Sequence, residues 1–145
     1  EWSWTGECVY DYEYEEFVPC GKGTMKVPEL GVYRGEVLDG GIFHGKGTFL
    51  FSDGEKYEGE WENNRMHGQG SYKYPDGTEY VGEWSNDKFH GNGLFKFPSG
   101  NEYVGESSNG EWHGKGTWYY PESDDGPPYS EDVEYVNGEE IIDNE

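Results

Sequence analysis

Hydrophobic and polar residues alternate in short stretches along the chain, and this period of two predicts half-buried β-strands. Residues 56–61 read KYEGEW, which places Tyr57, Gly59 and Trp61 on one side of a strand. Residues 68–74 read GQGSYKY and alternate in the same way. Turn sequences follow, with PDG at 75–77 and PSG at 98–100, where proline presets the turn and glycine accepts a positive φ. The pattern therefore predicts hairpins joined by tight turns.

The same unit recurs about every 23 residues. The string HGxG begins at positions 44, 67, 90 and 113, and a string YxGE precedes it at positions 33, 57, 80 and 103. Divergent copies lie at both ends, with TGE and CGKG near the N-terminus and YVNGE at 135–139. A repeat of this length predicts units that contact only their neighbours. We expect an antiparallel meander of about ten strands plus a terminal one.

The alternation also predicts which residues face each other across a hairpin. A four-residue loop at 62–65 would place every aromatic side chain and every motif glycine on one face, and charged residues, His and Thr on the other. An aromatic ring would then cover each glycine, which offsets the weakness of glycine in strands. The expected opposing pairs are Trp61 with Met66, Glu60 with His67, Gly59 with Gly68, and Tyr57 with Gly70.

Composition excludes several classes of protein. The chain contains 24 glycines and no alanine, which disfavours helices. Aromatic residues make up 18% of the 145 residues, too many for a disordered chain. Ten basic residues against 31 acidic ones argue against a nucleic-acid partner. No apolar stretch approaches the roughly 20 residues that span a bilayer.

The strings YxGEW and HGxG, closed by YPDG and repeated every 23 residues, resemble MORN repeats. The resemblance covers roughly residues 4–120, with Val37 and Ser107 in place of the motif tryptophan. It implies an all-β fold, an elongated single-layer antiparallel sheet of stacked hairpins. We expect five hairpin units in residues 1–120, the first with an expanded loop, then an acidic insertion at 121–134 and a degenerate strand with an acidic tail at 135–145.

The resemblance implies a non-catalytic scaffold that binds other proteins. The chain is similar to MORN-repeat subunits of ciliary radial spokes and to MORN-repeat organisers of the cytoskeleton. This resemblance implies a cytoplasmic protein at the cytoskeleton or the axoneme of a cilium. Two cysteines and no Asn-x-Ser/Thr site also favour an intracellular protein. The alternative is a phospholipid-binding module, which needs a basic patch. Here the lysines are scattered among more numerous acids, so a membrane partner is disfavoured.

Most rings of the aromatic face should form the core by covering glycines, but nothing packs above the rings of a single-layer sheet, so part of the row should stay exposed as the candidate binding surface. The alternative is that the flanking segments fold over this groove. Tyr and Trp are enriched at the centres of interfaces. We expect a helix or an extended peptide of a partner protein to lie along it, and the open sheet edges also allow a homodimer. The candidate residues are Tyr57, Trp61, Tyr72, Tyr80, Trp84, Phe95, Tyr103 and Trp118.

Other candidate sites are weaker. Equivalent histidines lie about 9.6 Å apart, too far to share a zinc ion, so we expect structural His67–Glu60 and His90–Glu83 pairs and no metal. The string at 40–46 resembles a phosphate loop but lacks its Ser/Thr and its helix. No nucleophile with a base is visible, so we expect neither catalysis nor a cofactor. Cys8 and Cys20 bracket the expanded first loop, which a disulfide would close, but the inferred register places them on opposite faces and so favours free thiols.

Charge is concentrated at the two ends. The net charge is −21, but residues 21–120 hold all ten basic residues and contribute only −5. Residues 1–20 carry six acidic residues and residues 121–145 carry ten, with no basic residue in either segment. The sequence therefore describes a nearly balanced repeat array with two acidic ends, which either keep arrays from stacking or contact a basic neighbour.

Overall fold

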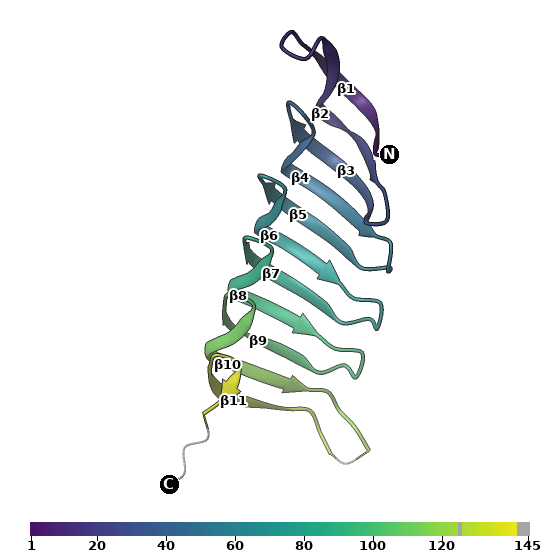
Figure 1. Cartoon of the computed structure of the whole chain (residues 1–145). Helices are drawn as coiled ribbons and strands as arrows, with labels where there is room; N and C mark the ends of the chain where they lie inside the picture. The colour runs from purple at the N-terminus through teal and green to yellow at the C-terminus, as the bar shows by residue number, and fades with distance from the viewer. Residues whose placement is uncertain (125, 142–145) are drawn as a thin grey trace.

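The computed structural model of the chain describes residues 1–124 and 126–141. It forms one antiparallel sheet in which each strand pairs with its neighbours in the sequence. Figure 1 shows the strands stacked in a single layer from the N-terminus to the C-terminus. The strands are β1 (Ser3–Asp11), β2 (Glu16–Val27), β3 (Gly31–Leu38), β4 (Ile42–Phe51), β5 (Lys56–Glu62), β6 (Arg65–Lys73), β7 (Glu79–Ser85), β8 (Lys88–Lys96), β9 (Glu102–Ser108), β10 (Glu111–Tyr120), β11 (Tyr129–Val136) and β12 (Glu139–Glu140).

The expected all-β meander is confirmed, and it contains twelve strands in the described residues. The final hairpin, β11–β12, adds a short terminal strand. Strand β11 begins at Tyr129, within the segment 121–134 that the sequence assigns to an insertion. Before this strand, Ser123 and Gly126 form an isolated antiparallel bridge.

The expected register is correct near the turns and wrong beyond them. Glu60 opposes His67 as expected, but Gly59 opposes Gly70, not Gly68, and Tyr57 opposes Tyr72. Residues 68 and 69 form a bulge in β6. The bulge exists because Gly68 adopts φ 60°, and the carboxylate of Glu60 occupies the space where a Cβ would lie. Four other pairings, β1–β2, β3–β4, β7–β8 and β9–β10, have a register shift in the same region.

The turn at 62–65 is also tighter than the expected four-residue loop. Glu62 still pairs with Arg65, so only Asn63 and Asn64 form the turn, and both have positive φ. Such a two-residue turn matches the twist of the flanking strands. Its asparagines tolerate the left-handed region better than most residues, which explains their place in the repeat.

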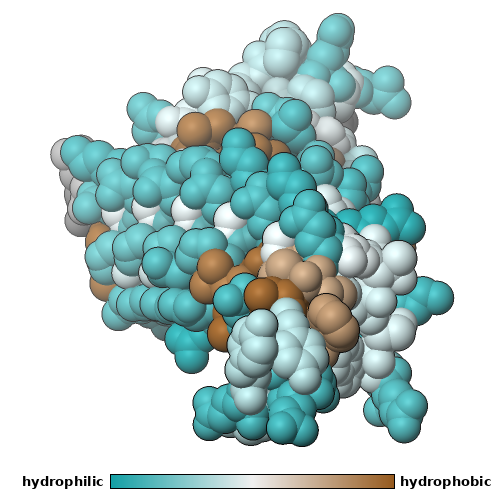
Figure 2. Space-filling view, turned by 90° about the horizontal axis from the view of Figure 1, so that it is seen from above, coloured by the Kyte–Doolittle hydropathy of each residue, from teal (hydrophilic) through white to brown (hydrophobic). Residues whose placement is uncertain are grey.

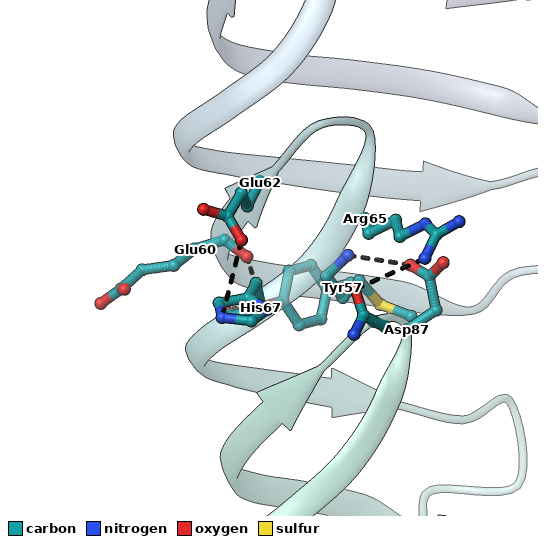
Figure 3. Close-up of polar contacts among 8 residues, drawn as sticks. Tyr57, Glu60, Glu62, Arg65, His67 and Asp87 are labelled. Carbon is teal, nitrogen blue, oxygen red and sulfur yellow. Dashed lines mark hydrogen bonds and ion pairs between the residues drawn. The ribbon is translucent and has the colours of Figure 1, made fainter. Parts of the chain in front are cut away.

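Each turn also binds the preceding unit. The backbone N–H of Asp87 donates to the carbonyl of Met66 (3.0 Å), and the Asp87 Oδ1 accepts from the Met66 N–H (2.8 Å). Figure 3 shows Asp87 reaching from its turn toward this strand. Asn64 makes the same two hydrogen bonds with Phe43. These contacts fix the spacing of successive hairpins.

Ten strands contribute one glycine each to a continuous line across the sheet. We call this line the glycine row, and it consists of Gly6, Gly23, Gly35, Gly47, Gly59, Gly70, Gly82, Gly93, Gly105 and Gly116. The face that these residues share with the Tyr and Trp side chains is the aromatic face. The opposite face, which carries residues such as Arg34, Lys46 and Glu58, is the polar face.

Tyrosine rings occupy the space above the glycine row. A Cβ added to Gly82 would lie 2.6 Å from the Tyr80 hydroxyl oxygen and 2.6 Å from the backbone of Asn92 and of Gly93. The equivalent tyrosines Tyr33 and Tyr57 cover their own glycine pairs in the same way. All three are completely buried. Glycine is therefore required by close approach of a ring and of a neighbouring backbone.

We predict that Gly82→Ala destabilises the protein by about 2 kcal/mol, because the new methyl group overlaps both a ring and backbone atoms. Gly126→Ala is the control, since a Cβ there meets no described atom within 4 Å. Removal of glycine at an unstrained site is usually neutral or slightly stabilising. Urea unfolding measures both variants. Equal free energies of unfolding for the two variants would contradict the packing described above.

Candidate interaction surface

The aromatic face is built around one tyrosine in each repeat. Each ring lies over the glycine row, and in three of the four main repeats its hydroxyl group donates to a backbone carbonyl three residues later. These bonds satisfy a polar group that the packing would otherwise leave buried without a partner. The bonds are Tyr33 to Glu36 (2.7 Å), Tyr57 to Glu60 (2.8 Å) and Tyr80 to Glu83 (2.8 Å).

The motif tryptophans connect adjacent repeats. The Trp84 ring lies edge-on to Tyr57 of the preceding repeat (5.2 Å between centroids) and to Tyr80 of its own (5.3 Å). Its indole N–H donates to the carbonyl of Gly70 (3.2 Å). Trp61 makes the equivalent bond to Gly47 (3.1 Å). Edge-to-face packing and these hydrogen bonds join the rings of successive repeats into one continuous line, which we call the ladder. The ladder tyrosines are Tyr33, Tyr57, Tyr80 and Tyr103.

Two repeats lack the motif tryptophan, and a ring from the opposite strand compensates. Phe43 opposes Val37 and stacks on Tyr33 at 3.9 Å. Trp112 opposes Ser107 and stacks on Tyr103 of the same repeat at 4.7 Å.

Serine in place of the motif tryptophan leaves buried polar atoms without partners near Ser107. The Oγ of Ser107 and the hydroxyl of Tyr103 are both buried, and neither has a hydrogen-bond partner in the described part of the chain. The other three ladder tyrosines each have such a partner.

The candidate residues named from the sequence lie together on this face, but most of them are core. Seven are buried against one another and Trp118 is partly buried. Their rings are therefore used mainly in folding. The buried seven are Tyr57, Trp61, Tyr72, Tyr80, Trp84, Phe95 and Tyr103.

Partly exposed side chains flank this buried line on both sides. We call them the outer rows. They recur with the same period of about 23 residues and precede either a tight turn or a motif histidine, a signal that the sequence already contained. One row contains Phe51, Tyr74, Phe97 and Tyr120, and the other contains Met66, Phe89 and Trp112.

The outer rows pack onto the core without being covered by it. Phe97 stacks on Trp118 at 5.4 Å, and Tyr74 lies 4.8 Å from Tyr72. Viewed end-on in Figure 2, most of the surface is hydrophilic and apolar residues appear only as small patches. Because the outer rows are only partly buried, a partner that approaches the aromatic face meets them first.

The polar face contains shallow hollows of mixed charge. One of them, about 740 Å³, lies near the C-terminal end and is lined by Lys115, Thr117 and Asp132 together with apolar residues such as Val104 and Ile141. The Thr117 hydroxyl donates to Asp132 at 2.8 Å. A second hollow of about 430 Å³ lies farther toward the N-terminus, beside Arg34.

The histidines lie at the bulges, and the expected His67–Glu60 ion pair is absent. His67 Nε2 lies 3.8 Å from a carboxylate oxygen of Glu62 instead. Figure 3 shows the Glu60 side chain extending away from the imidazole ring, because its carboxylate fills the space beside Gly68. The expected His90–Glu83 pair is likewise not formed: Glu83 Oε1 accepts from the backbone of Asn92 (3.1 Å).

The remaining candidate chemistry is sparse. Among residues 1–124 and 126–141, no group of three His, Cys, Asp or Glu side chains is placed to hold a metal ion. Cys8 and Cys20 are free thiols, as expected. Loss of solvation, together with the charges of Asp39 and Glu7, raises the pKa of Cys20. In the same part of the chain, no helix is both long and apolar enough to cross a bilayer.

Burial shifts the titration of the ladder tyrosines. It raises the pKa of Tyr33, Tyr57 and Tyr80 well above the ordinary value of about 10, and the carboxylate three residues later adds to the shift. Burial also raises the pKa of Tyr103 to about 12. The folded state therefore favours the neutral phenol.

We predict that the protein loses stability as the pH rises above about 10, because the unfolded chain releases its phenolic protons first. Below that pH the contribution of these groups to stability is complete. Tyrosinate absorbance and circular dichroism, recorded together during an alkaline titration, test this. The absorbance of the ladder tyrosines should increase only as the sheet unfolds. Full ionisation of all tyrosines near pH 10 with an intact sheet would contradict it.

Comparison with known proteins identifies the repeats. The MORN repeat family matches residues 33–56, 57–79, 80–102 and 103–124, which together cover more than half of the chain. A search of curated proteins found no match. MORN repeats indicate a module that interacts with proteins or membranes, and the family is generally non-catalytic. The repeats, their glycine row and their ladder of rings show that the chain belongs to the MORN-repeat family.

Proposed function

We propose that this chain is a non-catalytic scaffold that binds a helix or an extended segment of a partner protein along its aromatic face. The observation that carries the proposal is the pair of outer rows, which leave aromatic and Met side chains half-exposed along the length of the sheet. Side chains of these types dominate the energetic centres of interfaces. A long segment would gain contacts with each repeat in turn.

The proposal places the contacts on the outer rows more than on the buried ladder. Tyr57 and Tyr80 have no exposed surface to lose on binding. Phe97 and Tyr74 do, and their rings already pack against rings of neighbouring residues in the free protein. A preorganised surface loses little conformational entropy when a partner binds.

We also propose a setting for this scaffold. Its support is the resemblance to ciliary radial-spoke proteins and to cytoskeletal organisers, which favours a structural subunit of a larger cytoplasmic assembly at the cytoskeleton or the axoneme. The open edge of β1 and the part of β11 that β12 leaves unpaired allow a homodimer, but the acidic residues on both terminal segments repel one another.

We predict that a photo-crosslinking amino acid at position 74 or 97 captures one and the same partner protein in cells. Positions 81 and 104 are the controls. Val81 and Val104 lie on strands next to those that lead to positions 74 and 97, but they are exposed on the polar face. Crosslinks from the outer row but not from the control positions are expected. Equal capture of that partner from the polar face would contradict the proposed binding side.

Binding to a phospholipid surface is the second candidate function. Its support is the register, which aligns Lys26, Lys56, Lys73 and Lys96 at one level of the polar face. Glu79 and the neighbouring acidic residues interrupt this row, however. Anionic headgroups need accumulated positive charge, so we rank this function second.

Vesicle flotation separates the two functions. We predict that the protein does not float with phosphoinositide-containing vesicles at a physiological ionic strength of about 0.15 M. A positive-control lipid-binding domain should float under the same conditions. Flotation that disappears in the variant Lys56→Gln/Lys73→Gln would reverse the ranking.

A further inference from the structure

The hairpin β1–β2 extends farther than the other hairpins. Its strands remain paired as far as Tyr10 with Phe17 and Asp11 with Glu16. Every residue of the segment 10–17, which reads YDYEYEEF, is either aromatic or acidic. We call this segment the tip. No other segment of eight residues in the sequence has this composition.

Within the described residues, the tip is paired only within its own hairpin, because β3 pairs with β2 only over residues 21–27. The turn of the next hairpin contacts β2 through the hydrogen bond from Gly40 N–H to the carbonyl of Pro19 (3.1 Å). That bond corresponds to the one from Asn64 to Phe43 in the following repeat. The part of β2 before Pro19 therefore lies beyond the turn of the neighbouring hairpin. Figure 1 shows the tip as the loop that joins β1 and β2 at the N-terminal end of the array.

The aromatic rings of the tip lie outside the hydrophobic core. Tyr12 is 87% exposed, Phe17 72% and Tyr14 68%. Tyr10 lies 5.0 Å from Tyr12 and 5.2 Å from Phe17, so the rings contact one another rather than the core. Clustered exposed aromatic side chains of this kind mark sites of interaction.

The carboxylates of the tip are available to an external cation. Asp11 stabilises the turn by accepting from the backbone N–H groups of Glu13 (2.8 Å) and Tyr14 (3.3 Å). The other three acidic side chains, Glu13, Glu15 and Glu16, are exposed. The ion pairs found in the described residues all lie outside the tip. The first 20 residues also contain no basic residue that could neutralise them.

Exposed rings interleaved with carboxylates match one cation best. The planar guanidinium group of arginine stacks on aromatic faces and also binds carboxylates through paired hydrogen bonds. The ammonium group of lysine is a strongly hydrated point charge and gains less from the rings. A projecting hairpin fits a concave surface. We propose that the tip inserts into an arginine-lined groove of a partner protein.

This second surface does not depend on the function proposed for the aromatic face. The outer rows begin beyond the tip along the array and carry no acidic cluster of this kind. Loss of binding along the aromatic face would leave the tip unaffected, and the reverse also holds. The two proposals can therefore fail separately.

Titration with octa-arginine and octa-lysine peptides tests the tip. The tip variant Tyr12→Ser/Tyr14→Ser/Phe17→Ser keeps every charge and removes only rings that are exposed. The control variant Tyr119→Ser/Tyr129→Ser removes exposed rings at the other acidic end. Calorimetry gives the affinities, and two-dimensional NMR spectra of the full chain give the location of the bound peptide.

We expect the wild-type protein to bind octa-arginine more tightly than octa-lysine, with chemical-shift changes centred on residues 10–17. The tip variant should bind octa-arginine at least about tenfold more weakly, because three rings that stack on guanidinium groups are removed. The control variant should change this affinity less than about twofold.

Three outcomes would overturn the proposal. They are equal affinity for the two peptides, equal weakening in the tip and control variants, and shift changes spread over both acidic ends. Each would indicate attraction to negative charge in general. Circular dichroism and thermal unfolding should be unchanged in the tip variant, because its rings lie outside the core. These measurements separate lost binding from lost folding.

Discussion

The packing of a tyrosine ring on a pair of glycines is the contact on which the rest of this sheet depends. A single layer of strands has no second layer to bury its hydrophobic side. Here the glycine row removes side chains from the middle of the sheet, and the rings of Tyr33, Tyr57, Tyr80 and Tyr103 lie in the space that is freed. The sheet thereby forms a core from its own aromatic side chains.

The bulges and the tryptophans follow from this packing. The ring of Tyr57 reaches Gly70 diagonally because the bulge at Gly68 shifts the register of β6 by two residues. Trp84 then fits between the tyrosines of two repeats and donates to the Gly70 carbonyl. Each repeat is thus tied to the next by side chains as well as by strand pairing. The stability of such an array is approximately a sum of repeat and neighbour terms.

The same packing determines where a partner can bind. Rings that cover the glycine row are already buried, so the surface for a partner consists of side chains that the core leaves half-exposed. The outer rows provide such side chains along the repeats, and the tip provides them at the N-terminal end. Folding and binding are therefore assigned to different aromatic residues of one chain.

The sequence predicts much of this arrangement, because strand alternation and a 23-residue repeat are strong signals. Fold class, strand order and the shared face of aromatic and glycine residues follow from them. The register beyond Glu60 does not, because alternation cannot reveal a bulge of two residues, although the positive φ of Gly68 explains it afterwards. That most rings form the core also follows from the sequence, but which of them are fully buried, such as Tyr57 and Trp84, does not, because it depends on how rings of adjacent repeats pack in three dimensions.

Hydrogen exchange of the variant Tyr80→Ala, followed residue by residue, tests the role of the ring most directly. If each ring holds its own strands together, amides in residues 79–96 should lose protection by at least about tenfold, while those around Tyr33 keep theirs. Unchanged protection in residues 79–96 would contradict this account. A uniform loss across the whole sheet would contradict it as well, because it would show that the rings do not act repeat by repeat.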